Sequence, residues 1–316
     1  MKRTPPTSPR TVPSLTTPTC VHKLTGYQWL VPSIRTGTTN IFLVAPDTGD
    51  ARNLTRNSAE NRYPAWSPDG NRCVFTSNLD GAHNIYTMTA SGSRLRQLTH
   101  EMAPAICFLP SWSADNKIAF GRDRKGHVEI VVMNADGSRP AAVGEGTDPC
   151  ISPDGRSIAF TRKKGTGYCV WLMDVDGKNV RPLTTHENEI GAVVQTWSPD
   201  GRELLYSGQA GDALEIFVCG ARTGKPKQLT HLAQMSTSAA WSPDGKWISF
   251  RATKSAFWRD AESYRAAQDH RDTLRPVLVM RADGSDLRVV ETLRYQCSTD
   301  GSRAVWRSAG NAIQRD

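Results

Sequence analysis

Three histidines stand at nearly the same place behind a recurring Leu-Thr pair, and their residue type and spacing suit them to chemistry. They are His100, His186 and His231. Acidic residues directly follow His100 and His186, and imidazole together with carboxylate can hold a divalent metal ion or transfer protons. The alternative is that they are common surface residues of a repeat, with rings too far apart to share a ligand. We therefore expect no obligatory cofactor, and we keep a divalent metal at these histidines as a hypothesis to test.

Residues 252–276 form one long segment between two stretches that read as strands. Phe257, Ala261 and Tyr264 fall at i, i+4 and i+7, which predicts the apolar face of a helix. A connection this long is usually functional or disordered, and aromatic and arginine side chains dominate binding sites. The alternative is a helix that only packs on the fold. With polar residues of the other long connections, the candidate ligand-binding residues are Arg62, Asp148, Glu189, Gln234, Trp258, Arg259, Tyr264 and Arg265.

No complete catalytic motif is present in the sequence. Residues 220–225 resemble a phosphate loop, but the segment is one residue short and Pro226 stands where Ser or Thr is needed. Residues 174–179 resemble part of a calcium loop without its closing Glu. The Gly-x-Ser-x-Gly elbow of hydrolases is missing as well. We predict a non-catalytic binding or scaffolding protein, with a lyase or hydrolase acting on a sugar-like substrate as the alternative.

A repeated pentapeptide indicates the elements that must position these residues. Trp-Ser-Pro-Asp-Gly occurs at 66–70, 197–201 and 241–245, with looser copies at 112–116, 151–155 and 297–301. In such a turn Pro presets φ, Asp accepts hydrogen bonds from the backbone and Gly supplies a positive φ. A hairpin signal roughly every 40 to 50 residues predicts a β-propeller, in which each repeat forms one four-stranded blade.

The two ends of the chain carry incomplete repeats. Residues 40–44 and 52–55 read as a third and a fourth strand, and residues 295–307 read as a first and a second. We therefore predict an all-β, six-bladed β-propeller closed by pairing of its N- and C-terminal strands, which leaves no free sheet edge. A further strand at 26–31 would favour seven blades. The predicted domains are a flexible, Pro/Thr-rich segment at 1–25 and a single propeller at 26–316.

The pentapeptide, the apolar strand after it, a Met-Asn/Asp-x-Asp-Gly turn and the closing Leu-Thr resemble the TolB-like β-propeller repeat, also described as WD40-like. The resemblance covers about residues 40–307 and implies the fold more than an activity. TolB itself is a periplasmic protein of the Tol–Pal envelope system, with an α/β domain ahead of its propeller. Similar propellers occur in oligogalacturonate lyases, which hold a metal by histidine side chains.

The predicted strand order assigns the two faces of the propeller. The Ser-Pro-Asp-Gly turns and the Asp-Gly turns lie on one face, which we call the turn face, and we interpret them as structural. The opposite loop face carries the connections between second and third strands and the crossings between blades. Repeat folds place variable loops on the binding face. We therefore expect a protein segment or a carbohydrate to dock on the loop face and at the channel mouth.

The charge distribution argues against nucleic acid as a partner. The formal net charge is +8, but residues 1–46 hold five basic residues and no acidic one, so the remainder is close to balanced. Seven cysteines without a Cys-x-x-Cys motif suggest buried thiols in a reducing compartment. No apolar run has the length of a signal peptide or a membrane span. We expect a cytoplasmic monomer, or a periplasmic one if the true start lies upstream.

Overall fold

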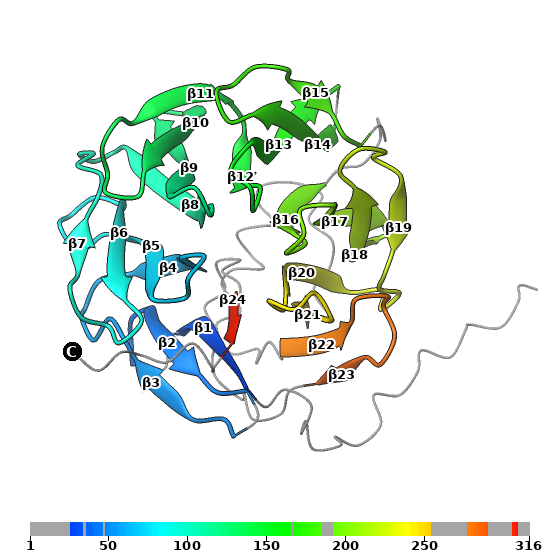
Figure 1. The fold of residues 1–316 in the computed structure, drawn as a ribbon, viewed down its shortest axis with the longest axis horizontal. Coiled ribbons are helices and arrows are strands. Elements are labelled where there is room, and N and C mark those ends of the chain that lie inside the picture. The colour runs from blue at the N-terminus through cyan, green and yellow to red at the C-terminus, as the bar shows by residue number, and fades with distance from the viewer. Residues whose placement is uncertain are drawn as a thin grey trace, which may run out of the picture.

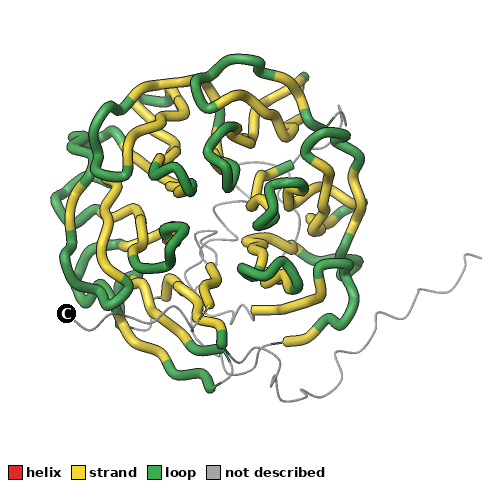
Figure 2. The backbone as a smooth tube through the Cα atoms, in the orientation of Figure 1, coloured by secondary structure: helices red, strands yellow, loops and turns green. Residues whose placement is uncertain are grey.

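The computed structural model describes residues 26–33, 36–46, 48–165, 167–184, 192–253, 277–289 and 305–308. Within these ranges the chain forms strands, turns and loops, and no helix (Figure 2), which confirms the all-β prediction. The strands are grouped into antiparallel blades that stand around a central axis (Figure 1). The segment 1–25 and residues 254–276 of the predicted helix lie outside the described residues. Ala252 and Thr253 continue a strand instead.

Each blade built from consecutive strands has its first strand at the axis and its fourth at the rim (Figure 1). We name a blade after its first strand. The β4 blade comprises β4 (Asn61–Trp66), β5 (Arg72–Ser77), β6 (Asn84–Thr89) and β7 (Arg96–Gln97). The β8 blade comprises β8 (Ile106–Trp112), β9 (Lys117–Arg124), β10 (His127–Asn134) and β11 (Ala141–Glu145). The β12 blade comprises β12 (Thr147–Ile151), β13 (Ser157–Lys164), β14 (Gly167–Asp174) and β15 (Arg181–Pro182).

Two further blades are linked to each other. The β16 blade comprises β16 (Val193–Trp197), β17 (Glu203–Ala210), β18 (Ala213–Gly220) and β19 (Pro226–Gln228). The β20 blade comprises β20 (Met235–Trp241), β21 (Trp247–Thr253), β22 (Val277–Arg281) and β23 (Arg288–Val289). A single parallel pair, Leu214 opposite Met235, connects β18 to β20.

The remaining sheet, which we call the terminal sheet, combines segments from both ends of the chain. Its order is β24 (Val305–Ser308), β1 (Tyr27–Ser33), β2 (Asn40–Val44) and β3 (Ala51–Asn53). β1 pairs antiparallel with β24, and Tyr27 stands opposite Ser308. The stretch at 26–31 is therefore the second strand of this sheet. The prediction that residues 295–307 supply two strands is wrong in this respect, because β1 occupies the second place.

The Ser-Pro-Asp-Gly turns join first and second strands through one repeated set of hydrogen bonds. In the turn between β4 and β5, Ser67 Oγ donates to Asp69 Oδ1 at 2.6 Å, and the Asn71 N–H donates to the same oxygen at 3.0 Å. Gly70 takes a φ of +69°, which costs glycine little. The same serine-to-aspartate bond recurs at Ser152, Ser198 and Ser242. The motif therefore acts locally, as the sequence predicts, by closing a hairpin.

The threonine of the Leu-Thr pair fastens each crossing segment to the third strand of its blade. Thr99 Oγ1 donates to Asn84 Oδ1 at 2.8 Å and accepts from the Ile85 N–H at 2.9 Å. The Glu101 N–H donates to the same Asn84 oxygen at 2.8 Å. Corresponding bonds join Thr55 to Asn40 and Thr230 to Glu215. The recurring pair is thus a latch that fixes where each crossing starts on the loop face.

Neighbouring sheets pack against each other through apolar side chains of their second and third strands. Phe75, Phe120, Phe160 and Phe250 occupy corresponding places and are each 1% exposed. Burying one such side chain contributes about 1.5 to 3 kcal/mol. The terminal sheet packs on the β20 blade through Trp29 and on the β4 blade through Leu30 and other residues.

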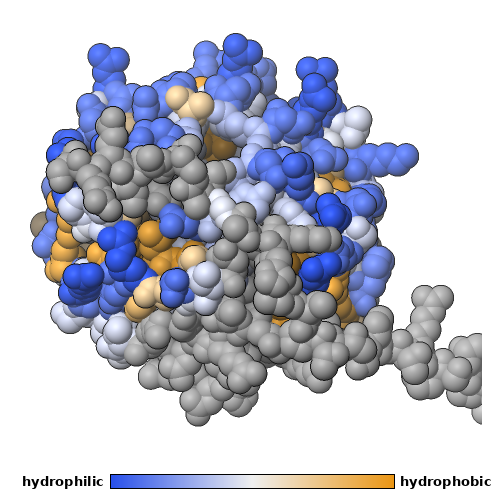
Figure 3. Space-filling view, turned by 60° about the horizontal axis from the view of Figure 1, so that its bottom comes forward, coloured by the Kyte–Doolittle hydropathy of each residue, from blue (hydrophilic) through white to orange (hydrophobic). Residues whose placement is uncertain are grey.

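The cysteines follow the same pattern of burial. The five cysteines in the described part of the chain are buried and form no disulfide, as predicted: Cys73, Cys107, Cys150, Cys169 and Cys219. Hydrophilic residues cover most of the coloured surface in Figure 3, with smaller apolar areas between them. The apolar side chains are therefore mainly used between the blades.

Candidate functional site

Three of the candidate ligand-binding residues lie within the described residues, and they belong to different blades. Arg62 stands on β4, with its Nη2 2.9 Å from Glu60 Oε2. Asp148 stands on β12 and accepts a hydrogen bond from Thr147 Oγ1 at 2.8 Å. Gln234 lies in the crossing between β19 and β20. The other five lie outside the described residues: Glu189, Trp258, Arg259, Tyr264 and Arg265.

The histidines are divided in the same way. His100 and His231 directly follow the latch residues Thr99 and Thr230 in different blades, and both are exposed. His186 lies outside the described residues. Within the described ranges, no group of three His, Cys, Asp or Glu side chains is placed to hold a metal ion. A site that includes His186 stays a prediction. Elemental analysis of protein purified without a histidine tag or chelator tests it.

The β8 blade departs from the latch pattern and carries a cluster of charged residues near the loop face. Gly144 stands opposite Ile130, at the place where four other sheets have a latch threonine. Glu129 pairs instead with Arg122, at 2.6 Å between Oε1 and Nη2. Glu101 contacts both Arg122, at 3.4 Å, and Arg124, at 2.7 Å. The hydrogen bond from Arg124 is the main cause that lowers the pKa of Glu101. These four charges neutralise one another.

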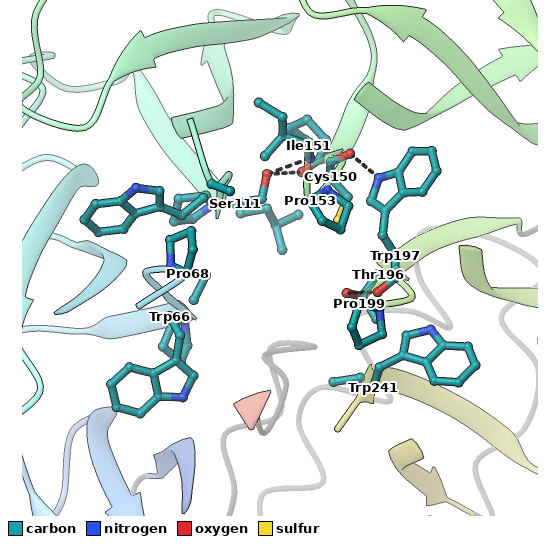
Figure 4. A pocket seen from close by; sticks show the side chains of 18 of the residues that line it. Trp66, Pro68, Ser111, Cys150, Ile151, Pro153, Thr196, Trp197, Pro199 and Trp241 are labelled. Atoms are coloured by element: carbon teal, nitrogen blue, oxygen red, sulfur yellow. Dashed lines mark hydrogen bonds between the residues drawn. The ribbon is translucent and has the colours of Figure 1, made fainter. Parts of the chain in front are cut away.

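A cavity of about 420 Å³ lies at the axis, where first strands of different blades converge (Figure 4). Four tryptophans and seven prolines are among its lining residues, and none of the lining side chains is charged. In Figure 4, Pro68, Pro153 and Pro199 stand on the inner side, and the rings of Trp197 and Trp241 are directed away from the axis. Trp197 is only 6% exposed. The turn prolines Pro68, Pro153 and Pro199 therefore form part of the accessible apolar wall.

Each first strand at this cavity is interrupted by a β-bulge. The pairing register shifts in β4, β8, β12, β16 and β20. Tyr63, Leu109 and Asp148 take φ values of +52°, +51° and +52° at the bulge. Each of them precedes a proline, Pro64, Pro110 or Pro149. A proline has no N–H to donate, so these strands lack a backbone donor at the bulge.

Side chains form hydrogen bonds with backbone groups of the neighbouring blade near the bulges. Ser111 Oγ donates to the Pro149 carbonyl oxygen at 3.3 Å and accepts from the Ile151 N–H at 3.0 Å, across the seam between the β8 and β12 blades. Across the next seam, the Val194 N–H donates to Thr161 Oγ1 at 3.1 Å. Backbone groups of the first strands are thus already hydrogen-bonded to side chains of the adjacent blade.

The seams of the β16 blade use two further contacts. The indole Nε1 of Trp197 donates to the Cys150 carbonyl oxygen at 2.8 Å. The Ala239 N–H donates to Gln195 Oε1 at 3.2 Å. Both bonds are buried, where a hydrogen bond satisfies groups that could not reach water. They hold the first strands of adjacent blades at a fixed spacing around the cavity.

The turn of the β8 blade differs from the consensus pentapeptide for a visible reason. Its sequence has Ala114 where four of the other copies have proline, and Asn116 where all the other copies have glycine. The Ala114 N–H donates to the Pro153 carbonyl oxygen of the next turn at 3.2 Å. A proline at position 114 could not make this bond. The irregular copy therefore joins two neighbouring turns at the cavity rim.

The cavity lies among residues for which the sequence predicts only a structural role. The loop-face candidates Arg62, Asp148 and Gln234 are not among its lining residues. It is lined instead by residues of the repeated pentapeptide, whose turns the sequence predicts to be structural, and by Pro64, Pro110 and Pro149 at the bulges. The signal that could have revealed it is the side-by-side placement of these copies at the axis, because five blades each contribute the pentapeptide or a looser copy of it to the wall.

Comparisons with known proteins show that the chain is similar to TolB propellers. A family model described as the TolB beta propeller domain matches residues 25–194. A stretch of 147 residues is 29% identical to a protein named Protein TolB homolog from Chlorobium luteolum, and covers 45% of this chain and 33% of that protein. The chain spans less than two-thirds of the length of this relative and of three other curated ones.

Solved structures show the likeness of the fold. The putative TolB from Agrobacterium tumefaciens has a TM-score of 0.64 and 20% identity, over 84% of this chain and 88% of that one. An oligogalacturonate lyase in complex with manganese has a TM-score of 0.56 and 17% identity, over 81% and 71%. At these identities the likeness shows the fold alone. In the part of the chain that the structure describes, no helix has the length and apolar character to span a bilayer.

Proposed function

The chain belongs to the TolB beta propeller domain family, and on that premise we propose that it is a non-catalytic binding propeller that holds a segment of a partner protein in the axial cavity. The observation that carries this proposal is the lining of the cavity. It is rich in tryptophan and proline and free of charged side chains. Aromatic and proline rings offer a large contact area with little conformational entropy to lose on binding.

The size of the cavity supports the same proposal. A volume of about 420 Å³ lies within the range of sites that hold one small ligand or a few side chains. The wall is held rigid by the buried bonds from Trp197 to Cys150 and from Ala239 to Gln195. A preformed wall does not have to be ordered at the moment of binding, which favours affinity.

Peptide display tests this function. Random peptides selected on the full chain should include binders that lose at least tenfold in affinity on Thr196→Glu, because this change places a charge in the cavity wall. Thr196→Val keeps the shape of the side chain and should retain binding. Val180→Glu adds the same charge at an exposed position outside the cavity lining and should also retain it. If all selected binders ignore Thr196→Glu, the proposal is contradicted.

We further propose that the propeller has six blades, that residues 26–316 form one domain, and that the terminal sheet closes the ring. The antiparallel pairing of β1 with β24 supports this proposal. A second support is the hydrogen bond of the Tyr27 hydroxyl with Asp244 of the β20 blade. Burial, first, and this hydrogen bond raise the pKa of Tyr27 to about 12. Removing residues 305–316 should lower the melting temperature clearly. An unchanged melting temperature would argue against closure by β24.

A further inference from the structure

We infer that the segment held in the axial cavity is uncharged and contains proline, and that side-chain contacts hold it in place of backbone pairing as an added β-strand. This inference rests on the function proposed above. It narrows the partner to one chemical class of peptide. Three properties of the cavity wall carry it: its charge, its supply of backbone donors and the rings that it exposes.

The first property is the absence of charge from the lining. None of the lining side chains could pair with a charged group of a ligand. The charged cluster of the β8 blade does not line the cavity, and its Arg122 and Arg124 are engaged by Glu101 and Glu129. Burying an unpaired charge costs far more than burying an apolar group. A bound segment should therefore carry no Asp, Glu, Lys or Arg at the positions inside the cavity.

The second property is the poor supply of backbone donors. An added strand needs a row of N–H and C=O groups along an open sheet edge. Here the bulges interrupt the first strands, and Pro64, Pro110 and Pro149 have no N–H. The N–H groups of Val194 and Ala239 are bound by side chains of adjacent blades. The edges around the axis are therefore poorly suited to pair with an incoming strand.

The third property is the kind of surface that remains. Pro68 and Pro199 are exposed, and Pro153 is half-buried. All three stand on the inner side of the Ser-Pro-Asp-Gly turns, toward the axis (Figure 4). Proline-rich segments adopt an extended helix without internal hydrogen bonds, and they bind grooves lined by aromatic side chains at a low entropic cost. Tyr63 and Trp66, both half-buried, are aromatic residues of this wall. Such a segment would need few backbone bonds from the wall. Its chemistry thus matches what the cavity offers.

Four synthetic peptides, with acetylated and amidated ends so that the termini carry no charge, test the inference on the full chain. One alternates proline and leucine, two replace its leucines by glutamate or by lysine, and one alternates valine and threonine to favour a strand. Affinity is measured by calorimetry and by tryptophan fluorescence, with wild type, Thr196→Glu and Thr196→Val. The proline–leucine peptide should bind at least tenfold more tightly than the other three. Thr196→Glu should abolish this binding, and Thr196→Val should retain it.

Two failures are distinguishable. If a charged or a valine–threonine peptide binds as tightly, with the same dependence on Thr196→Glu, the inference falls and the proposed function stands. If none of the four binds, the peptides from the display selection decide. Cavity-dependent binders enriched in uncharged, proline-containing sequences support the inference, and charged ones overturn it. If no displayed peptide depends on the cavity, the function falls and the inference falls with it.

Discussion

The indole N–H of Trp197 and the carbonyl oxygen of Cys150 form a hydrogen bond of 2.8 Å across the seam between the β16 and β12 blades. Trp241 occupies the corresponding place in the next blade, but its Nε1 has no hydrogen-bond partner among the described residues. The two tryptophans are similarly buried, at 6% and 9% exposure. They therefore allow the contribution of one hydrogen bond to be separated from that of the apolar ring.

Replacing these tryptophans by phenylalanine measures that contribution. Trp197→Phe should lower the free energy of unfolding by about 0.5 to 1.5 kcal/mol more than Trp241→Phe, because it removes a buried hydrogen bond that Trp241 does not make. Urea unfolding of both variants, at equal protein concentration, gives the difference. Equal losses would show that the bond between Trp197 and Cys150 does not stabilise the seam.

Restoring the consensus turn in the β8 blade should destabilise the protein. Ala114→Pro removes the N–H that donates to the Pro153 carbonyl oxygen, and the expected loss is about 1 to 3 kcal/mol. The matched change Asn116→Gly also restores the consensus. Asn116 has a φ of +58°, a value that glycine adopts without steric cost, so this variant should be as stable as wild type or slightly more stable. A stable Ala114→Pro variant would contradict the role of this bond.

The turn aspartates should make stability depend on acid pH. The hydrogen bond from Ser198 Oγ, first, and that from the Arg202 N–H lower the pKa of Asp200 in the folded chain. The unfolded chain, with an aspartate pKa of about 3.9, takes up its proton first as the pH falls. The stabilisation is therefore complete above the unfolded pKa and is lost as the pH falls through the folded one.

The serine gives a variant that tests this sign. Ser198→Ala removes the main cause of the shift, so its deficit in urea midpoint relative to wild type should be larger at neutral pH than at about pH 3. Asp200→Asn cannot titrate and should show a flatter dependence on pH than wild type over the same range. A deficit of Ser198→Ala that stays constant with pH would refute the linkage.

The latch threonine should be sensitive to loss of its hydroxyl group. Thr99→Val keeps the volume but removes the bonds to Asn84 Oδ1 and the Ile85 N–H, and we expect a loss of about 1 to 3 kcal/mol. Thr99→Ser keeps the hydroxyl and should lose clearly less. Thermal unfolding of the two variants compares them directly, and the reverse order would disprove the latch.

Much of the fold was predictable because its signals are local. A Ser-Pro-Asp-Gly turn closes within a few residues, and the alternating strands around it can be recognised without tertiary information. The latch was not predictable in the same way. Thr99 and Asn84 are 15 residues apart, and nothing in either residue type indicates the other. The place of β1 was equally hidden, since its partner β24 comes from the other end of the chain.

The axial cavity escaped prediction for a different physical reason. A residue before proline is normally extended, so Tyr63 and Leu109 give no sign of the left-handed bulge that they adopt. The pentapeptide also has two uses at once. Its serine and aspartate close a hairpin, while its proline lines a cavity that exists only when several blades meet. A one-dimensional reading assigns the first use and misses the second.

The seams have a consequence for how the repeats are ordered. One seam is joined by Ala114 with Pro153, the next by Trp197 with Cys150, and a third by Gln195 with Ala239. Interchangeable blades could associate in several permutations while the chain is still collapsing, and repeat proteins are prone to such misassembly. Because these three junctions use different pairs of residues, they favour a single circular order of the blades. Duplicating one blade would add a junction whose two sides do not match.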